Sequence, residues 1–98
     1  MERINSYQTY TEKALYIKQK ESLYEAIIQA EEKARQALQE YEALDSANAD
    51  KTIVDNAYAK SEQADSLYRL YINKHKAVDN IISLLDRLTD ELEYLETC

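Results

Sequence analysis

The segment Leu44–Ile53, with the sequence LDSANADKTI, separates two long apolar repeats and decides how the chain folds. Apolar and small residues recur at alternating spacings of four and three before it, over residues 16–44, and after it, over residues 53–95. Leu44 and Ile53 hold equivalent positions of this repeat, but they are nine residues apart rather than seven. On one continuous helix, two extra residues at about 100° each would carry the second apolar stripe to nearly the opposite side. The pattern therefore predicts two helices with a turn between them.

Short polar residues in this segment favour a turn, because Asp, Asn and Ser bond readily to their own backbone. The chain has no Gly and no Pro, so Asn48 is the residue best suited to the left-handed conformation of a tight turn. Asp50 is suited to cap the second helix. At the other end of the chain, Thr9 and Glu12 match the spacing of a capping box for the first helix, whereas Ile4 and Tyr7 suggest helix or ordered packing before it.

We expect one all-α domain over residues 1–98, folded as a long antiparallel, coiled-coil-like helical hairpin. Its first helix spans about residues 6–44, its turn about 45–50 and its second helix about 51–96. The abundance of Ala, Leu, Glu, Lys and Gln agrees with this, since these residues lose little on entering a helix.

Each apolar repeat forms a heptad seam. The first seam consists of Tyr16, Lys20, Leu23, Ile27, Ala30, Ala34, Ala37, Tyr41 and Leu44. The second consists of Ile53, Ala57, Lys60, Ala64, Leu67, Tyr71, Lys74, Val78, Ile81, Leu85, Leu88, Leu92 and Leu95. Lysines interrupt the seams at a few positions, and no carboxylate is obviously aligned with them. We therefore expect their methylene chains to pack along the seam and their ammonium groups to remain in water.

The far end of the hairpin has more apolar surface on the second helix than the first helix can cover. Facing residues in such a hairpin have numbers that sum to about 97. The leucines at 85, 88 and 92 then face Lys13, Thr9 and Ser6. Three arrangements resolve this mismatch: a second copy completes a four-helix bundle, a different protein covers the leucines, or the N-terminal stripe of the first helix rotates inward.

The sequence thus predicts a non-enzymatic protein–protein interaction module, acting as an adaptor, a chaperone or an inhibitor. The expected partner-binding residues are Ile81, Leu85, Leu88, Leu92 and Leu95, supported by Tyr7, Tyr10 and Ile17. An inhibitor encoded by a phage or mobile element, a secretion chaperone and a subunit of a larger assembly all fit this description. The expected partner is another protein, a second copy of the chain, or both.

The net charge of −7, from 19 acidic and 12 basic residues, disfavours direct binding to nucleic acid or to an anionic membrane. It also suggests an alternative function, in which an acidic face mimics nucleic-acid phosphates and blocks a DNA- or RNA-binding enzyme. The residues of that acidic face are Asp79, Asp86, Asp90 and Glu93.

The sequence contains no signature of catalysis, of a cofactor or of a metal site. His75 is the only histidine and has no Glu or His at the spacing of a helical zinc site. Cys98 is the only cysteine, so no internal disulfide forms. Neither a signal peptide nor a membrane-spanning segment is evident, and we expect a cytoplasmic protein, in the host cytoplasm if a phage encodes it.

Overall fold

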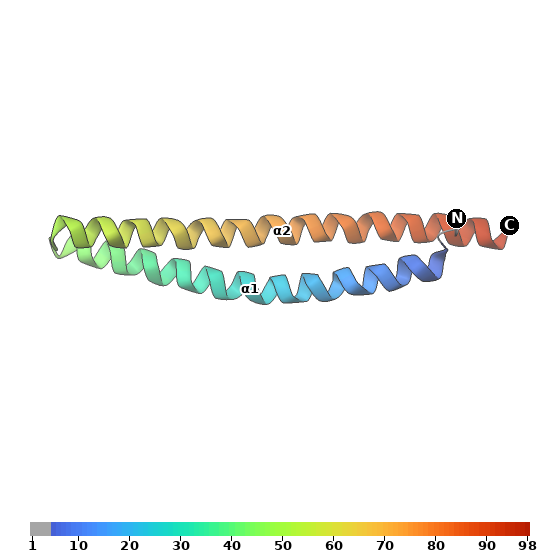
Figure 1. Ribbon diagram of the computed structural model, residues 1–98, viewed down its shortest axis with the longest axis horizontal. Coiled ribbons are helices and arrows are strands. Elements are labelled where there is room, and N and C mark those ends of the chain that lie inside the picture. The colour runs from blue at the N-terminus through green and yellow to red at the C-terminus, as the bar shows by residue number, and fades with distance from the viewer. Residues whose placement is uncertain (1–4) are drawn as a thin grey trace. The chain divides into compact units, whose positions relative to one another are not determined.

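The computed structural model describes residues 5–98 and confirms an all-α helical hairpin. Helix α1 spans Ser6–Ser46 and helix α2 spans Lys51–Thr97, each ending within two residues of the expected bounds. The two helices are joined by a short turn (Figure 1). The chain divides into two compact units. We call residues 5–23 with Lys74–Cys98 the terminal unit, and Tyr24–Asn73 the turn unit.

The turn is built around Asn48, whose φ of 54° is left-handed, as predicted. The Asn48 amide donates to the carbonyl of Asp45 at 3.2 Å, and the Ala49 amide donates to the carbonyl of Leu44 at 3.1 Å. These two bonds form a Schellman motif, which satisfies carbonyls at the end of α1. Asp50 directly precedes α2, and its carbonyl accepts from the amide of Val54 at 3.0 Å, as expected at an N-cap position.

Helix α1 begins at Ser6, as expected, so the capping box at Thr9 and Glu12 does not form and Asn5 takes the N-cap position instead. The Asn5 side chain accepts from the amide of Gln8 at 2.9 Å, and the Gln8 side chain accepts from the amide of Asn5 at 3.0 Å. This reciprocal pair satisfies two amides at the start of the helix. It frees Thr9 to pack inside the hairpin, where only 2% of the residue is exposed.

The seam of α1 is confirmed, because every position predicted between Tyr16 and Leu44 is buried or half-buried. The same spacing continues toward the N-terminus through Lys13, Thr9 and Ser6, which are also buried or half-buried. The inner side of α1 therefore alternates polar residues with Tyr16 and Leu23 in the terminal unit, whereas no charged residue lies on it in the turn unit.

The seam of α2 is confirmed at seven predicted positions and displaced by one residue at most of the others. The confirmed positions, which are buried or half-buried, are Ala57, Ala64, Tyr71, Val78, Ile81, Leu85 and Leu92. The other predicted residues are exposed: Ile53, Lys60, Leu67, Lys74, Leu88 and Leu95. After the first five of these the next residue packs inward instead, so that Val54, Ser61, Tyr68, His75 and Thr89 are buried or half-buried, and Ile82 is half-buried beside Ile81. The helix is therefore rotated slightly about its axis relative to the sequence-based seam.

Small side chains line the interior of the turn unit. Ala30, Ala37, Ala57 and Ser61 are buried there, and the Tyr41 and Tyr58 rings pack with centroids 5.3 Å apart. Over residues 5–98, no buried side chain is larger than threonine. The described part of the hairpin thus encloses no core of fully buried large apolar side chains. No described helix carries an apolar stretch long enough to cross a membrane.

The turn generates a first prediction. Asn48→Ala should lower the free energy of unfolding by about 1 kcal/mol, because a Cβ without a local polar partner is disfavoured in the left-handed region. Asn48→Gly should preserve or raise stability. Urea unfolding followed by circular dichroism measures both. Equal stability of the alanine variant and the parent would contradict this account of the turn.

Candidate protein-binding face

A polar layer joins the two helices of the terminal unit. The hydroxyl groups of Thr9 and Thr89 lie 2.6 Å apart, and both residues are buried. Each hydroxyl also reaches a carbonyl on its own helix: Thr9 donates to Ser6 at 2.8 Å, and Thr89 can donate to Leu85 at 2.7 Å. Buried hydroxyl groups need such partners, since losing one leaves a costly unsatisfied group.

Ion pairs extend this layer along one side of the seam. Lys13 pairs with Asp86, and the Lys20 ammonium lies 2.6 Å from a carboxylate oxygen of Asp79. Hydrogen bonding and charge from Lys20 hold the pKa of Asp79 below its ordinary value. The expectation that Lys20 lacks an aligned carboxylate is therefore wrong, because the one-residue rotation of α2 places Asp79 opposite it.

Two further contacts involve acidic residues near the end of α2. The Glu96 carboxylate accepts from the backbone amide of Ser6 at 3.0 Å and from its hydroxyl at 2.7 Å, and these bonds lower the pKa of Glu96. The Tyr10 hydroxyl donates to Glu93. That hydrogen bond, together with the negative charge of Glu93, raises the pKa of Tyr10.

The acidic residues and the exposed apolar residues of α2 lie on opposite sides of the seam. The acids at 79, 86 and 93 each directly follow a seam position, whereas Ile81, Leu88 and Leu95 each directly precede one. Because each residue turns the helix by about 100°, the two sets diverge. We call Asp79, Asp86 and Glu93 the acidic flank.

The side of the seam opposite the acidic flank is apolar, and most of its residues are exposed. Leu84 and Leu95 are 60% and 66% exposed, and Leu88 is 37% exposed. Leu15 of α1 is 59% exposed and precedes the seam position Tyr16, which puts it on the same side as these leucines. We call Leu15, Ile81, Leu84, Leu88 and Leu95 the leucine face.

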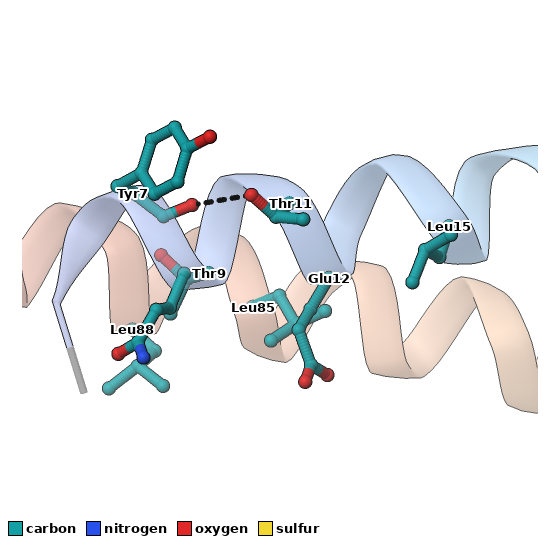
Figure 2. A pocket seen from close by; sticks show the side chains of 8 residues that line it. Tyr7, Thr9, Thr11, Glu12, Leu15, Leu85 and Leu88 are labelled. Carbon is teal, nitrogen blue, oxygen red and sulfur yellow. Dashed lines mark hydrogen bonds between the residues drawn. The ribbon is translucent and has the colours of Figure 1, made fainter. Parts of the chain in front are cut away.

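Two open clefts lie on this side of the terminal unit. The first, of about 460 Å³, runs between the helices and is lined by Glu12, Leu15, Leu85 and Leu88 among others (Figure 2). The second, of about 600 Å³, is lined by Lys18, Gln19, Ser22, Leu23, Lys74, Ala77 and Val78. Both clefts open to solvent, so the leucine face is a grooved surface with room for side chains of another molecule.

The structure brings together only part of the predicted partner-binding set. Leu85 and Leu92 are half-buried at seam positions, and Ile81, also half-buried, is at their edge with the exposed Leu88 and Leu95. These five residues lie along one side of α2.

The supporting residues of α1 are divided between surfaces. Tyr7 is 76% exposed and lies at the rim of the first cleft, with its ring pointing away from Leu85 and Leu88 (Figure 2). Tyr10 contacts the acidic flank, and Ile17, 38% exposed, follows its seam position on that same side. The partner-binding set predicted from the sequence included neither Leu15 nor Leu84. Extending the α1 seam through the polar Lys13 and Thr9 would have identified Leu15.

Three of the four acids assigned to the alternative function contact α1. Asp79 and Asp86 are in ion pairs, and Glu93 accepts from Tyr10; Asp90 is exposed. These contacts give the acidic flank a role within the hairpin. Among the described residues, no group of three or more His, Cys, Asp or Glu side chains has the arrangement of a metal site.

Comparison with protein-family models, with curated proteins and with solved structures gives no match.

The lowered pKa values predict how stability depends on pH. Asp79 and Glu96 hold protons more weakly in the folded chain than in the unfolded one, so below about pH 5 the unfolded state binds more protons. Their stabilising contribution is complete above that pH and is lost as the pH falls through their folded pKa values. The free energy of unfolding of D79N/E96Q should therefore decline less than that of the parent between about pH 5 and pH 3.

A control variant, D55N/E42Q, removes two exposed carboxylates from the turn unit and should keep the pH dependence of the parent. Urea unfolding at each pH measures all three proteins. If the free energy of unfolding falls equally with pH in the parent and in D79N/E96Q, these contacts do not stabilise the hairpin.

Proposed function

We propose that this chain is a non-enzymatic protein–protein interaction module, which docks onto another helical surface through the leucine face. The observation that carries the proposal is the exposure of large apolar side chains beside a seam that buries nothing larger than threonine within residues 5–98. A protein of this kind acts by holding a partner, as an adaptor, a chaperone or an inhibitor does.

The energetic argument rests on the leucines. Fully burying a leucine side chain contributes about 1.5–3 kcal/mol. Leu15, Leu84 and Leu95 are each more than half exposed in the hairpin, so most of that contribution is realised only when another surface covers them. Contiguous apolar patches of this kind mark interaction sites on soluble proteins.

The surroundings of the leucine face fit docking rather than chemistry. Polar groups surround it: Gln8, Thr11 and Glu12 lie at one cleft, and Lys18, Gln19, Ser22 and Lys74 at the other. An apolar centre with a polar rim is typical of a protein–protein interface. An amphipathic helix laid into such a groove would present apolar residues at spacings of three and four.

The acidic-mimic alternative receives no comparable support, because the acidic flank makes contacts within the hairpin. A decoy of nucleic acid needs carboxylates directed toward its target.

A double substitution on the leucine face tests the proposal. Leu84→Asp with Leu88→Asp adds two charges to the apolar surface and should weaken binding of a partner at least about tenfold, since burying the exposed parts of the two leucines together contributes about 1.5–3 kcal/mol. The tagged chain is cross-linked in its own cells, its partner is identified, and the complex is rebuilt from purified proteins for titration calorimetry.

The matched control S83D/Q63D adds the same charge at exposed positions of α2 outside the leucine face. It should retain wild-type affinity, and circular dichroism should show unchanged helicity in both variants. Equal binding by L84D/L88D and the wild type would exclude this face as the docking site. If the chain binds neither another protein nor a second copy of itself, the proposed function is wrong.

A further inference from the structure

The charges around the leucine face are arranged with opposite signs at its two ends. On α1, Glu12 lies at the first cleft and Lys18 at the second. On α2, Lys74 lines the second cleft, and Glu91 lies beyond the first, next to Leu95. One end of the face is therefore acidic and the other basic on both helices.

These charges share one centre of symmetry. Glu12 and Lys18 are equidistant from Leu15, and Lys74 and Glu91 are equidistant from the bond between Ile82 and Ser83. The seam contacts on either side of Leu15 have numbers that sum to 98 for Thr9 with Thr89 and to 99 for Lys13 with Asp86 and for Lys20 with Asp79. Position 15 is thus level with positions 83 and 84, within two residues of the midpoint on α2, so the two midpoints lie nearly side by side across the hairpin.

From this arrangement we propose that the partner on the leucine face is a second copy of the chain. The copies are related by a two-fold axis that crosses the hairpin at the level of Leu15, perpendicular to the helices. Each helix then packs antiparallel against its own copy, forming a four-helix bundle. The proposal rests on the proposed function and names the occupant of the same face.

A two-fold axis at this level pairs opposite charges. In an isologous interface, residue i of one copy meets residue j of the other, and j meets i. Lys74 of each copy then meets Glu91 of the other, and Lys18 meets Glu12. Rotation about an axis parallel to the helices would make the two α2 helices parallel and would lose both pairings.

The same axis matches large side chains to the available space. The position related to Leu88 is 77, where the exposed Ala77 lines the cleft of about 600 Å³. The position related to Leu84 is 81, where Ile81 provides an apolar contact. Leu15 lies on the axis and meets its own copy. Leu88 of each copy would thus fill the second cleft of the other, as a knob enters a hole in helical bundles.

The exposed area of the chain is large enough for this interface. The single chain exposes 7759 Å², whereas a folded monomer of 11.4 kDa exposes about 5,800 Å². The excess of roughly 2,000 Å² is spread over the whole chain, and a stable interface of ordinary size needs approximately 800 Å² of it per partner.

Molar mass in solution is the first test. Light scattering of the purified wild-type chain between about 1 and 100 µM should show a dimer that dissociates on dilution. L84D/L88D should be monomeric under the same conditions, and S83D/Q63D should dimerise like the wild type. A wild-type chain that stays monomeric overturns the second copy as occupant. The proposed function then still stands if the leucine face binds another protein, and falls only if it binds none.

The single cysteine reports the orientation of the copies. Cys98 is exposed and lies about 15 residues from the axis along α2. Spin labels on the two copies of Cys98 should therefore be about 45 Å apart, at 1.5 Å per residue on each side. Parallel packing would bring them within roughly 20 Å, because neighbouring helices are about 10 Å apart. The short distance would overturn the proposed axis.

Paired substitutions test the register. Lys74→Glu and Glu91→Lys should each raise the dimer dissociation constant severalfold, and K74E/E91K should restore it, because the double variant only exchanges the charges between ends. Ala77→Leu should block the cleft, and L88A/A77L should regain dimerisation by exchanging the large and small residues. Failure of both double variants to recover any affinity, with helicity unchanged, would exclude this register.

Discussion

The polar layer between Thr9 and Thr89 is the contact that orients the whole terminal unit. Two buried hydroxyl groups must satisfy each other or a nearby carbonyl, since an unmatched buried polar group costs about 1–3 kcal/mol. A leucine opposite Thr9 would leave that hydroxyl with only its own helix as partner. Relative to the seam predicted from the sequence, α2 is rotated about its axis, so that Thr89 lies inside the hairpin and Leu88 faces solvent. The same rotation brings Asp79 and Asp86 to Lys20 and Lys13.

Exposure of the leucine face follows from this match between polar residues. The inner side of α1 is polar at Ser6, Thr9 and Lys13, so it can accept only polar partners without a desolvation cost. The leucines of α2 cannot pack there and are displaced to one side, where Leu15 joins them. The acids of α2 are displaced to the other side. Polar matching inside the hairpin and apolar docking outside it are therefore consequences of one arrangement.

The two units differ in how the helices approach each other. Alanine and serine line the inside of the turn unit, where Ala30, Ala37, Ala57 and Ser61 are buried. The terminal unit instead uses threonine hydroxyls and ion pairs. Exposed ion pairs contribute little to stability, at most about 1 kcal/mol each, so they serve chiefly to set which residues face which. This specificity is what keeps the leucine face outside.

Sequence alone determined the helices, the turn and the seam of α1, because these depend on local properties. A nine-residue separation between Leu44 and Ile53 breaks the phase of the repeat, and Asn48 tolerates the left-handed conformation that the turn requires. Only the tertiary structure decided which side of α2 packs inward. Leucines at heptad spacing and a neighbouring row containing Ser61, His75 and Thr89 both have helical periodicity, and apolar content favours the leucines. The choice depends on pairing with α1 across the hairpin, where Thr9, Lys13 and Lys20 select the polar row, and such non-local matching leaves no signal in either helix by itself.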